Sequence, residues 1–362
     1  MKYRFFTHSQ RAWEGMLEAI RGARSSILWE SYILLDDTPM HRFVDVLKQK
    51  ARDGVMVKVI IDSIGAFRAD TDTLQRELEK AGAEALIFNR LLPWKNARWF
   101  HRSWLTRNHR KVLIVDGRIA FVGGVNVGER FRQWFDLHLR IEGIVVRRLL
   151  RAFVHMYKLC GGTDPAMRRI VSDAVPRTLM RRVKASALVH IPWWKQSRLR
   201  HYYLRRFQSA KKRITIVTPY FMPHRWFLDG LEQAQRRGVR VEVLLPGTSE
   251  NRWVKFANLL FACQAARRGV AVYLLKTRRM NHSKAVLIDA EGMVGSSNID
   301  SYSFQHNLET NVVFRRKDMV RRLERIIHRW KERSRRFHYQ ELHNRPLHRL
   351  LERFIFLLRP FL

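Results

Sequence analysis

Cysteine, acidic residues and long apolar runs are all scarce in this sequence of 362 residues. Its two cysteines, Cys160 and Cys263, are far apart and match no zinc-ligand spacing, which argues against a disulfide framework and predicts two free thiols. No stretch of about 18 consecutive residues is apolar, so no membrane-spanning helix is expected. The N-terminal segment is too polar for a secretory signal. These absences predict a soluble protein or one bound to a membrane surface.

Positive charge dominates what is present. Lys and Arg number 69 against 32 Asp and Glu, which gives a formal net charge of +37. A field of this size attracts polyanions, so it favours nucleic acid or the anionic face of a membrane as partner. Hydrophobic residues make up 46% of the chain, enough for a packed core, and the length suggests about two domains. Wholesale disorder is thereby excluded.

Strand and helix patterns alternate through the first half of the chain. Short apolar runs predict strands at 26–33, 55–62 and 85–88, and amphipathic runs that end before a glycine predict helices at 42–52 and 74–81. This βαβαβ order predicts a mostly parallel sheet that is covered on both faces.

The same order of elements recurs in the second half. The segment LKQKARDGVMVKVIID corresponds to LEQAQRRGVRVEVLLP, and two further segment pairs match in the same order. Three ordered matches, each with a helix-ending glycine before a strand, indicate an internal duplication and an α/β fold of two pseudo-symmetric halves. The expected divisions are a first half, a basic connecting segment, a second half and a basic amphipathic C-terminal tail, at residues 1–160, 161–200, 201–315 and 316–362.

One polar motif occurs at equivalent places in the two halves. It begins with Asn-His-x-Lys, continues with four apolar residues and an Asp, and after a short turn ends with Gly-[Gly/Ser]-x-Asn. The two copies occupy 108–126 and 281–298. Since alternate residues of a strand share a face, the His and Lys of each copy point to the same side. The small residues near the end of the motif would let a ligand approach the backbone.

These residue types suit the transfer of a phosphodiester. Such a reaction needs a nucleophile, an acid for the leaving oxygen and cations for the phosphate oxygens. Histidine titrates near neutral pH, so His109 and His282 can serve as neutral nucleophile and as acid. Lys111 and Lys284 supply fixed positive charge. No cluster of carboxylates suggests a metal site, and the lysines would repel a metal ion, so no metal or other cofactor is expected.

A carboxylate is expected to orient each imidazole, as in other histidine-dependent sites. Asp136 and Glu309 are the candidates, because they lie at the same offset of 27 residues after His109 and His282 respectively. Either could instead be an acid at the edge of the core that pairs with an arginine. Four further polar side chains at strand ends near the expected site are interpreted as packing or loop anchors that could also touch substrate: Glu30, Tyr32, Thr218 and Tyr220.

Two copies of H-x-K-x4-D, each followed by G-[GS]-x-N, resemble the phospholipase D superfamily. The resemblance covers about residues 1–315 and implies two phospholipase D-like halves, with mixed sheets covered by helices, around one shared active site. It also implies a phosphohistidine intermediate, with His109 as the nucleophile and His282 as the general acid and base. The same resemblance completes the catalytic set with Lys111, Lys284 and the motif aspartates Asp116 and Asp289, and makes Asn126 and Asn298 phosphate-binding residues.

Within that superfamily, RNHRKVLIVDGRIAFVGGVN and GSSNIDSYSFQHNLETNVVF resemble the bacterial cardiolipin synthases, in particular the shorter B-type without N-terminal membrane spans. This resemblance implies transfer of a phosphatidyl group from one phosphatidylglycerol to another, with release of glycerol. It places the enzyme peripherally at the cytoplasmic face of the bacterial cell membrane. The alternative is a phospholipase D-type phosphodiesterase that cleaves nucleic acid or hydrolyses phospholipid. The acceptor alcohol and the oligomeric state are left open.

Aromatic and basic residues are interleaved at 91–111, at 191–207 and in the C-terminal tail. Rings among cations suit the headgroup zone of an anionic bilayer, and they would equally suit stacking on single-stranded nucleic acid. Clusters of Trp, Leu and Phe outnumber polar side chains that could read bases, which favours the membrane. The apolar side chains of the tail that would dock on the bilayer, or alternatively pack on the second half, are Val320, Leu323, Ile327, Trp330 and those of 347–362.

Overall fold

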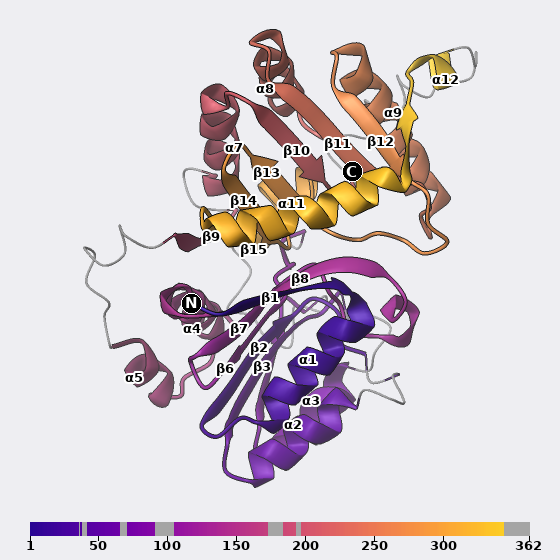
Figure 1. Ribbon diagram of the computed structural model, residues 1–362. Coiled ribbons are helices and arrows are strands. Elements are labelled where there is room, and N and C mark those ends of the chain that lie inside the picture. The colour runs from indigo at the N-terminus through magenta and orange to yellow at the C-terminus, as the bar shows by residue number, and fades with distance from the viewer. Residues whose placement is uncertain are drawn as a thin grey trace.

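Two α/β lobes of similar construction lie one above the other in the computed structural model (Figure 1). The structure describes residues 1–35, 37, 42–65, 71–90, 105–172, 184–192 and 197–343. Within these ranges, none of the helices is both long enough and apolar enough to cross a membrane.

The first lobe is built on a seven-stranded sheet in the order β1-β8-β7-β6-β2-β3-β4. Its strands are β1 Tyr3–His8, β2 Ser26–Ser31, β3 Met56–Asp62, β4 Glu84–Phe88, β6 Val112–Val115, β7 Ile119–Gly123 and β8 Phe135–Glu142. The three strands expected from the apolar runs correspond to β2, β3 and β4, so the sequence pattern located them correctly. Apolar β-branched residues buried on both faces explain why β3 is an interior strand, whereas the partly buried β4 lies at the edge of the sheet.

The second lobe repeats this order as β12-β11-β10-β13-β14-β15, with β16 beside β12. Its strands are β9 Ala185–His190, β10 Arg213–Val217, β11 Arg240–Pro246, β12 Ala271–Leu275, β13 Ala285–Ile288, β14 Glu291–Gly295, β15 Asn307–Phe314 and β16 Ser334–Phe337. Strand β9 pairs with β15 as β1 pairs with β8, so the second sheet reaches into the expected connecting segment 161–200.

Both sheets are mixed. Only β2-β3-β4 and β10-β11-β12 run parallel, and the remaining neighbours within each lobe are antiparallel. The expectation of a mostly parallel sheet is therefore wrong, whereas two pseudo-symmetric lobes with mixed sheets are confirmed. The physical reason is that each His-Lys motif contains a tight hairpin, β6-β7 or β13-β14, whose strands can only pair antiparallel, and the next strand, β8 or β15, returns antiparallel through a longer connection.

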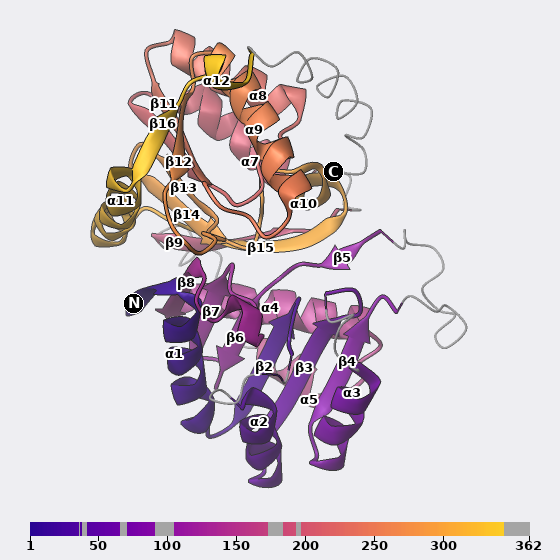
Figure 2. The same ribbon diagram turned by 90° about the vertical axis from the view of Figure 1, so that its right-hand side faces the viewer.

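Helices cover the outer faces and fill the space between the lobes (Figure 2). The α-helices are α1 Ser9–Arg21, α2 Phe43–Arg52, α3 Thr71–Lys80, α4 Ile144–Leu159, α5 Ala166–Ser172, α7 Arg198–Ser209, α8 Arg225–Arg236, α9 Arg252–Arg267, α10 Ser301–Gln305, α11 Lys317–Glu332 and α12 Gln340–His343. Helices α1 to α3 pack on one sheet and α7 to α9 on the other. Helices α4 and α11 join the inner faces of both sheets in a single apolar cluster, which fixes the lobes against each other.

The basic C-terminal tail is in part a component of this shared core. Val320, Leu323, Ile327 and Trp330 on α11 are buried in it. The expectation that these four side chains dock on a bilayer is wrong, because their apolar faces already pack inside the protein. The run 347–362, expected to dock as well, lies outside the described residues.

The aromatic and basic stretches 91–111 and 191–207 are each only partly described by the structure. Residues 91–104 of the first stretch lie outside the described part of the chain. In the second stretch, Leu199, Tyr203 and Phe207 on α7 are buried against the second sheet. These three side chains stabilise the lobe and are not available to a membrane or to nucleic acid.

Candidate active site

Each His-Lys motif forms backbone hydrogen bonds with a strand of the opposite lobe. The short strand β5, Arg107–Asn108, leaves the first lobe and pairs in parallel with β15 of the second. The backbone N–H of His109 then donates to the carbonyl of Leu308, 3.1 Å away. In the mirrored contact, the N–H of His282 donates to the carbonyl of Phe135 at 2.7 Å. Backbone pairing across the lobe interface therefore fixes where both histidines lie.

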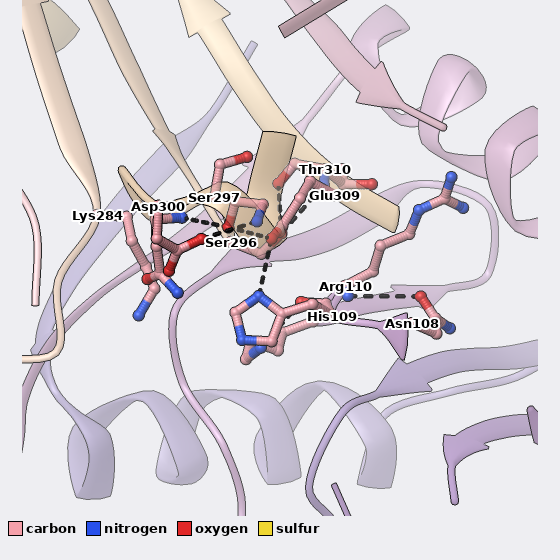
Figure 3. Close-up of polar contacts among 12 residues, drawn as sticks. Asn108, His109, Arg110, Lys284, Ser296, Ser297, Asp300, Glu309 and Thr310 are labelled. Carbon is pink, nitrogen blue, oxygen red and sulfur yellow. Dashed lines mark hydrogen bonds and ion pairs between the residues drawn. The ribbon is translucent and has the colours of Figure 1, made fainter. Parts of the chain in front are cut away.

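Both imidazoles contact a carboxylate that comes from the other lobe. Figure 3 shows the first of these contacts, between His109 and Glu309. His109 Nδ1 lies 3.0 Å from Glu309 Oε1, and His282 Nδ1 lies 3.0 Å from Asp136 Oδ2. The equal sequence offsets had suggested Asp136 for His109 and Glu309 for His282, and that pairing is wrong. The reason is the backbone exchange described above, because each carboxylate directly follows the carbonyl that receives the opposite histidine's N–H.

Glu309 is held by several donors. Its Oε1 accepts from Ser303 Oγ at 2.8 Å as well as from His109, and its Oε2 accepts from Ser296 Oγ. Burial alone would raise the pKa of Glu309, but His109, Lys111 and Ser296 together hold the pKa below its usual value. The carboxylate is therefore ionised and fixed in orientation.

The surroundings of the Asp136 carboxylate differ from those of Glu309, because a glycine lies where the second lobe has a serine. Gly124 occupies the position that Ser296 has in the second lobe, and a Cβ there would lie 2.3 Å from Asp136 Oδ1. A Cβ on Gly123 would lie 2.3 Å from the carbonyl of Leu137. The expectation that these glycines let a ligand approach the backbone is therefore wrong: strand β8 and the Asp136 carboxylate fill that space.

The carboxylate contacts select one tautomer for each imidazole. A carboxylate accepts a hydrogen bond, so Nδ1 of His109 and of His282 carries the proton and Nε2 carries the lone pair. The two lysines then differ. Each lysine donates to the carbonyl of its own motif's histidine, Lys111 at 2.9 Å and Lys284 at 2.7 Å, but only Lys284 Nζ also lies near the ring nitrogens, 2.8 Å from Nε2 and 3.0 Å from Nδ1 of His282.

Burial strongly favours the neutral form of both imidazoles in the empty site. It lowers the pKa of His109 to about 4, and the positive charge of Lys111 adds to the effect. Burial and the charge of Lys284 lower the pKa of His282 to about 3. Glu309 and Asp136 oppose these shifts without cancelling them. At neutral pH both rings are therefore neutral until an anion enters the site.

The two lysines face the same buried space and repel each other. Burial and the positive charge of Lys284 together lower the pKa of Lys111 to about 7. Burial lowers the pKa of Lys284 to about 8, against the attraction of Asp136 and Glu309. Two cationic groups that are buried in the same space are suited to a phosphate group.

Asn126 and Asn298 are also buried next to these motifs. The carbonyl of Asn126 accepts from Trp13 Nε1 at 3.0 Å, and the N–H of Asn298 donates to Ser303 Oγ at 3.0 Å. Among the described residues, Oδ1 of neither side chain has a hydrogen-bond partner. Both amides are thus firmly placed and retain bonding capacity, and phosphate binding by them stays a prediction.

The motif aspartates lie at the far end of their strands. The carboxylate of Asp116 accepts from the backbone N–H groups of Arg24, Ser25 and Ser26 at 2.8–3.1 Å. At roughly 3.3 Å per residue, β6 carries Asp116 about 16 Å from Lys111. A catalytic role for Asp116 is therefore wrong. The carboxylate of Asp289 accepts from the equivalent backbone N–H groups of the second lobe at 2.8–3.0 Å. The expected catalytic role of Asp289 is therefore wrong as well.

Three aromatic rings border the histidines. Tyr32 meets the His109 ring edge-on with centroids 4.8 Å apart, and Tyr220 meets His282 in the same way at 5.9 Å. Trp134 lies 5.4 Å from His282. The sequence had marked the two tyrosines as anchors near the site, but it gave no sign of Trp134 or of Ser303, since neither repeats at its equivalent position in the other lobe.

Among the described residues, no group of three or more His, Cys, Asp and Glu side chains is placed to hold a metal ion. The site instead offers two imidazoles, two ammonium groups and two carboxylates, shared between two lobes. That composition on this duplicated fold defines a two-lobed protein of the phospholipase D type.

The chain matches the family described as "Cardiolipin synthase, PLD-like domain" over residues 16–153 and 203–330, and it belongs to that family. Cardiolipin synthase 2 of Bacillus anthracis is 30% identical over 370 residues, which cover 99% of this chain and 70% of the relative. Cardiolipin synthase A of Pseudomonas putida is 30% identical over 356 residues, covering 96% and 71%. The protein is thus an enzyme of the phosphatidyltransferase type.

A solved structure shares the whole fold. Phosphatidylserine synthase of Haemophilus influenzae matches with a TM-score of 0.74 at 16% identity and covers 99% of this chain and 95% of that one. Polyphosphate kinase of Porphyromonas gingivalis matches with a TM-score of 0.64 at 13% identity, covering 94% and 49%. At these identities the likeness concerns the arrangement of the two lobes alone.

Proposed function

We propose that this enzyme makes cardiolipin by transferring the phosphatidyl group of one phosphatidylglycerol to the glycerol hydroxyl of another. One observation carries the proposal: each lobe supplies a buried His-Lys pair whose imidazole is oriented by a carboxylate of the other lobe. Two such pairs provide one nucleophile and one proton carrier around a single phosphate. The cardiolipin synthases among the relatives supply the substrate class.

In the first step, Nε2 of His109 attacks phosphorus and the bond from phosphorus to the glycerol oxygen breaks. His282 gives a proton to that oxygen, and glycerol leaves. Among the described residues, no lysine Nζ contacts the ring nitrogens of His109, whereas Lys284 Nζ lies within 3.0 Å of both ring nitrogens of His282. This difference supports His109 as the nucleophile. The bound phosphate anion favours the imidazolium form of His282, which burial disfavours in the empty site.

In the second step, His282 takes the proton of the acceptor's glycerol hydroxyl. The freed oxygen attacks phosphorus, the phosphorus–nitrogen bond breaks, and His109 is restored. Lys111 and Lys284, with Asn126 and Asn298, are proposed to hold the non-bridging oxygens through both steps. We therefore expect a covalent phosphatidyl–enzyme and no requirement for a divalent metal.

The reaction is proposed to take place at the cytoplasmic face of the bacterial membrane, with the enzyme bound peripherally. The net charge of +37 supports attraction to an anionic bilayer. Arginines and large apolar residues alternate through 347–362. Removing residues 345–362 should weaken sedimentation with phosphatidylglycerol vesicles at high salt. Equal sedimentation of the folded truncated protein would refute this role.

Labelled phosphatidylglycerol in vesicles tests the proposed reaction, with labelled single-stranded DNA as a parallel substrate. Cardiolipin and glycerol should appear together in the presence of EDTA. Quenching with denaturant at alkaline pH, where a phosphorus–nitrogen bond is stable, should trap label on the wild type but not on His109→Ala. Cleavage of the DNA without cardiolipin formation would make the enzyme a nuclease instead. Trapping that fails in His282→Ala and persists in His109→Ala would reverse the two roles.

A further inference from the structure

A cavity of about 750 Å³ opens in the second lobe, away from the residues of the two His-Lys motifs. It lies where β11 ends at Pro246 and β12 ends at Leu275, with α9 as its other wall. Strand β13 begins at this same edge, since Ala285 pairs with Val217 at the end of β10. Ligands of open α/β sheets bind in crevices at this edge. The cavity and Lys284 therefore share one edge of one sheet.

The cavity is a neighbour of the catalytic site and is distinct from it. Strands β11 and β12 are two and three places away from β13 in the sheet. At a strand spacing of about 4.8 Å, the lateral separation is roughly 10–14 Å. None of the residues that line the cavity belongs to the two His-Lys motifs.

Two chain segments connect the wall of the cavity to the catalytic histidine. Asn258, buried on α9 and lining the cavity, accepts from the N–H of Phe221 at 2.8 Å and donates to the carbonyl of Pro219 at 2.7 Å. The residue between those two is Tyr220, whose ring meets His282. Arg278, on the opposite wall, precedes the His282 motif by only a few residues. A ligand in the cavity would be held next to the reacting groups.

The charge on the cavity walls is entirely positive. Four cationic side chains line it, and no carboxylate does among the described residues: Lys255, Lys276, Arg278 and Arg335. Arg335 is paired with Glu341 at 2.8 Å. The other three cations have no acidic partner within the described parts of the chain. Three uncompensated cations around one cavity form a site for an anion, and phosphate is an anion that Lys and Arg recognise in proteins.

The remaining wall is apolar, which favours a lipid over free phosphate. Leu259 and Leu274 line the cavity beside the cations. The first turn of α9 also carries Trp253, whose side chain is 77% exposed and is the most exposed large apolar side chain in the described structure. Trp253 does not line the cavity, but an exposed indole on the same helix is typical of a surface at the headgroup level of a bilayer.

We propose that this cavity holds the phosphodiester of the acceptor phospholipid while its glycerol hydroxyl attacks the phosphatidyl–enzyme. The inference rests on the proposed function, in which two anionic lipids must be bound and the His-Lys pairs hold the phosphate of only one. The cations of the cavity bind the second phosphate, and the apolar wall contacts its glyceride part. Holding the acceptor there gives its hydroxyl an advantage over water.

The test variant is Lys255→Ala/Lys276→Ala/Arg278→Ala. Its matched control removes three exposed cations of the first lobe, Arg52→Ala/Lys80→Ala/Arg118→Ala, and so changes the net charge equally. In detergent micelles of varied phosphatidylglycerol content, three products are followed: the initial burst of glycerol, cardiolipin, and phosphatidate formed by hydrolysis.

The glycerol burst should be unchanged in the test variant, because the first step uses only the donor. The phosphatidylglycerol content for half-maximal cardiolipin formation should rise about tenfold or more, since each lost cation weakens the attraction to the anion. Product should shift from cardiolipin to phosphatidate. An unchanged half-maximal content and product ratio, or the same changes in the control variant, would overturn the proposal.

A binding measurement keeps this test independent of turnover. In His109→Ala, calorimetry with soluble glycerophosphoglycerol should find two sites, and adding the three cavity substitutions should leave one. Inorganic phosphate serves as the second probe. Two sites for phosphate but only one for glycerophosphoglycerol would assign the cavity to free phosphate. One site for glycerophosphoglycerol in both proteins would refute the proposal, even if the enzyme proved to act on another substrate.

Discussion

His109 and Glu309 are 200 residues apart in the sequence, yet Nδ1 of the imidazole and Oε1 of the carboxylate are 3.0 Å apart. Both side chains are buried where the two lobes meet. His282 and Asp136 form the mirrored pair. Neither lobe alone can therefore assemble a complete His-carboxylate pair, which explains why the duplicated chain needs both halves for one site.

Because Glu309 contacts His109 and Asp136 contacts His282, each carboxylate should affect a different step of the reaction. Glu309→Gln should slow formation of the covalent enzyme, because it removes the acceptor that holds His109 in its reactive tautomer. Asp136→Asn should slow protonation of the leaving glycerol and deprotonation of the acceptor through His282. Each should lower turnover by roughly 10²- to 10⁴-fold with little change in lipid binding. Rapid-quench trapping of labelled enzyme separates the two effects, and normal turnover in either variant would contradict the assigned role.

Gly124 predicts a site defect caused by a single methyl group. A Cβ at this position would lie 2.3 Å from Asp136 Oδ1, so Gly124→Ala must push the carboxylate away from His282. Turnover should fall about as far as in Asp136→Asn. Gly22→Ala is the control, because its added Cβ meets nothing closer than 3.4 Å. Full activity in Gly124→Ala would show that the Asp136 contact is dispensable.

The buried lysines predict the alkaline limb of the pH profile. Lys111, whose pKa burial and Lys284 lower to about 7, loses its charge above that pH in the free enzyme. Hence kcat/KM should decline above about pH 7, whereas kcat should decline only at higher pH because bound phosphate stabilises the ammonium. Lys111→Arg should move the limb of kcat/KM upward, since guanidinium stays charged. An identical limb for both parameters in the wild type would contradict this mechanism.

We expect substitution of Asp116 to lower the stability of the protein without lowering its kcat. Asp116→Asn removes charge-assisted acceptance from the N–H groups of Arg24, Ser25 and Ser26. The free energy of unfolding in urea should fall by about 1–3 kcal/mol. The kcat of the folded fraction should stay near that of the wild type. A large fall in kcat at temperatures where the variant is fully folded would restore a catalytic role for this residue.

His138 predicts sensitivity to acid. It is buried on β8, neither ring nitrogen has a partner among the described residues, and burial lowers its pKa to about 4. The unfolded chain takes up a proton near pH 6.5 whereas the folded chain does not, so stability falls as the pH drops from about 6.5 to 4. The change in the free energy of unfolding caused by His138→Leu should therefore be more favourable at pH 5 than at pH 7.5. An equal stability change at both pH values would contradict this assignment.

The local pattern of the sequence was enough to locate several strands and the two histidines that we propose as the reacting groups. Period-two apolar runs located β2, β3 and β4, and the repeated motif singled out His109 and His282. The pattern failed on strand direction, because a hairpin and a crossover can follow the same apolar run. It also failed on α11, since an amphipathic face looks the same whether it meets a core or a bilayer.

The sequence by itself determined two lobes of one design, each with a histidine, a lysine and a carboxylate at fixed spacing. Only the tertiary structure decided which carboxylate serves which histidine, because equal offsets in two equal halves do not distinguish a partner in the same lobe from one in the other. That choice follows from the edge contacts of β5 with β15 and of Phe135 with Asn281. The apolar cluster shared by α4, α11 and both sheets holds those edges together. Long-range packing, which no local spacing encodes, thus completes the site.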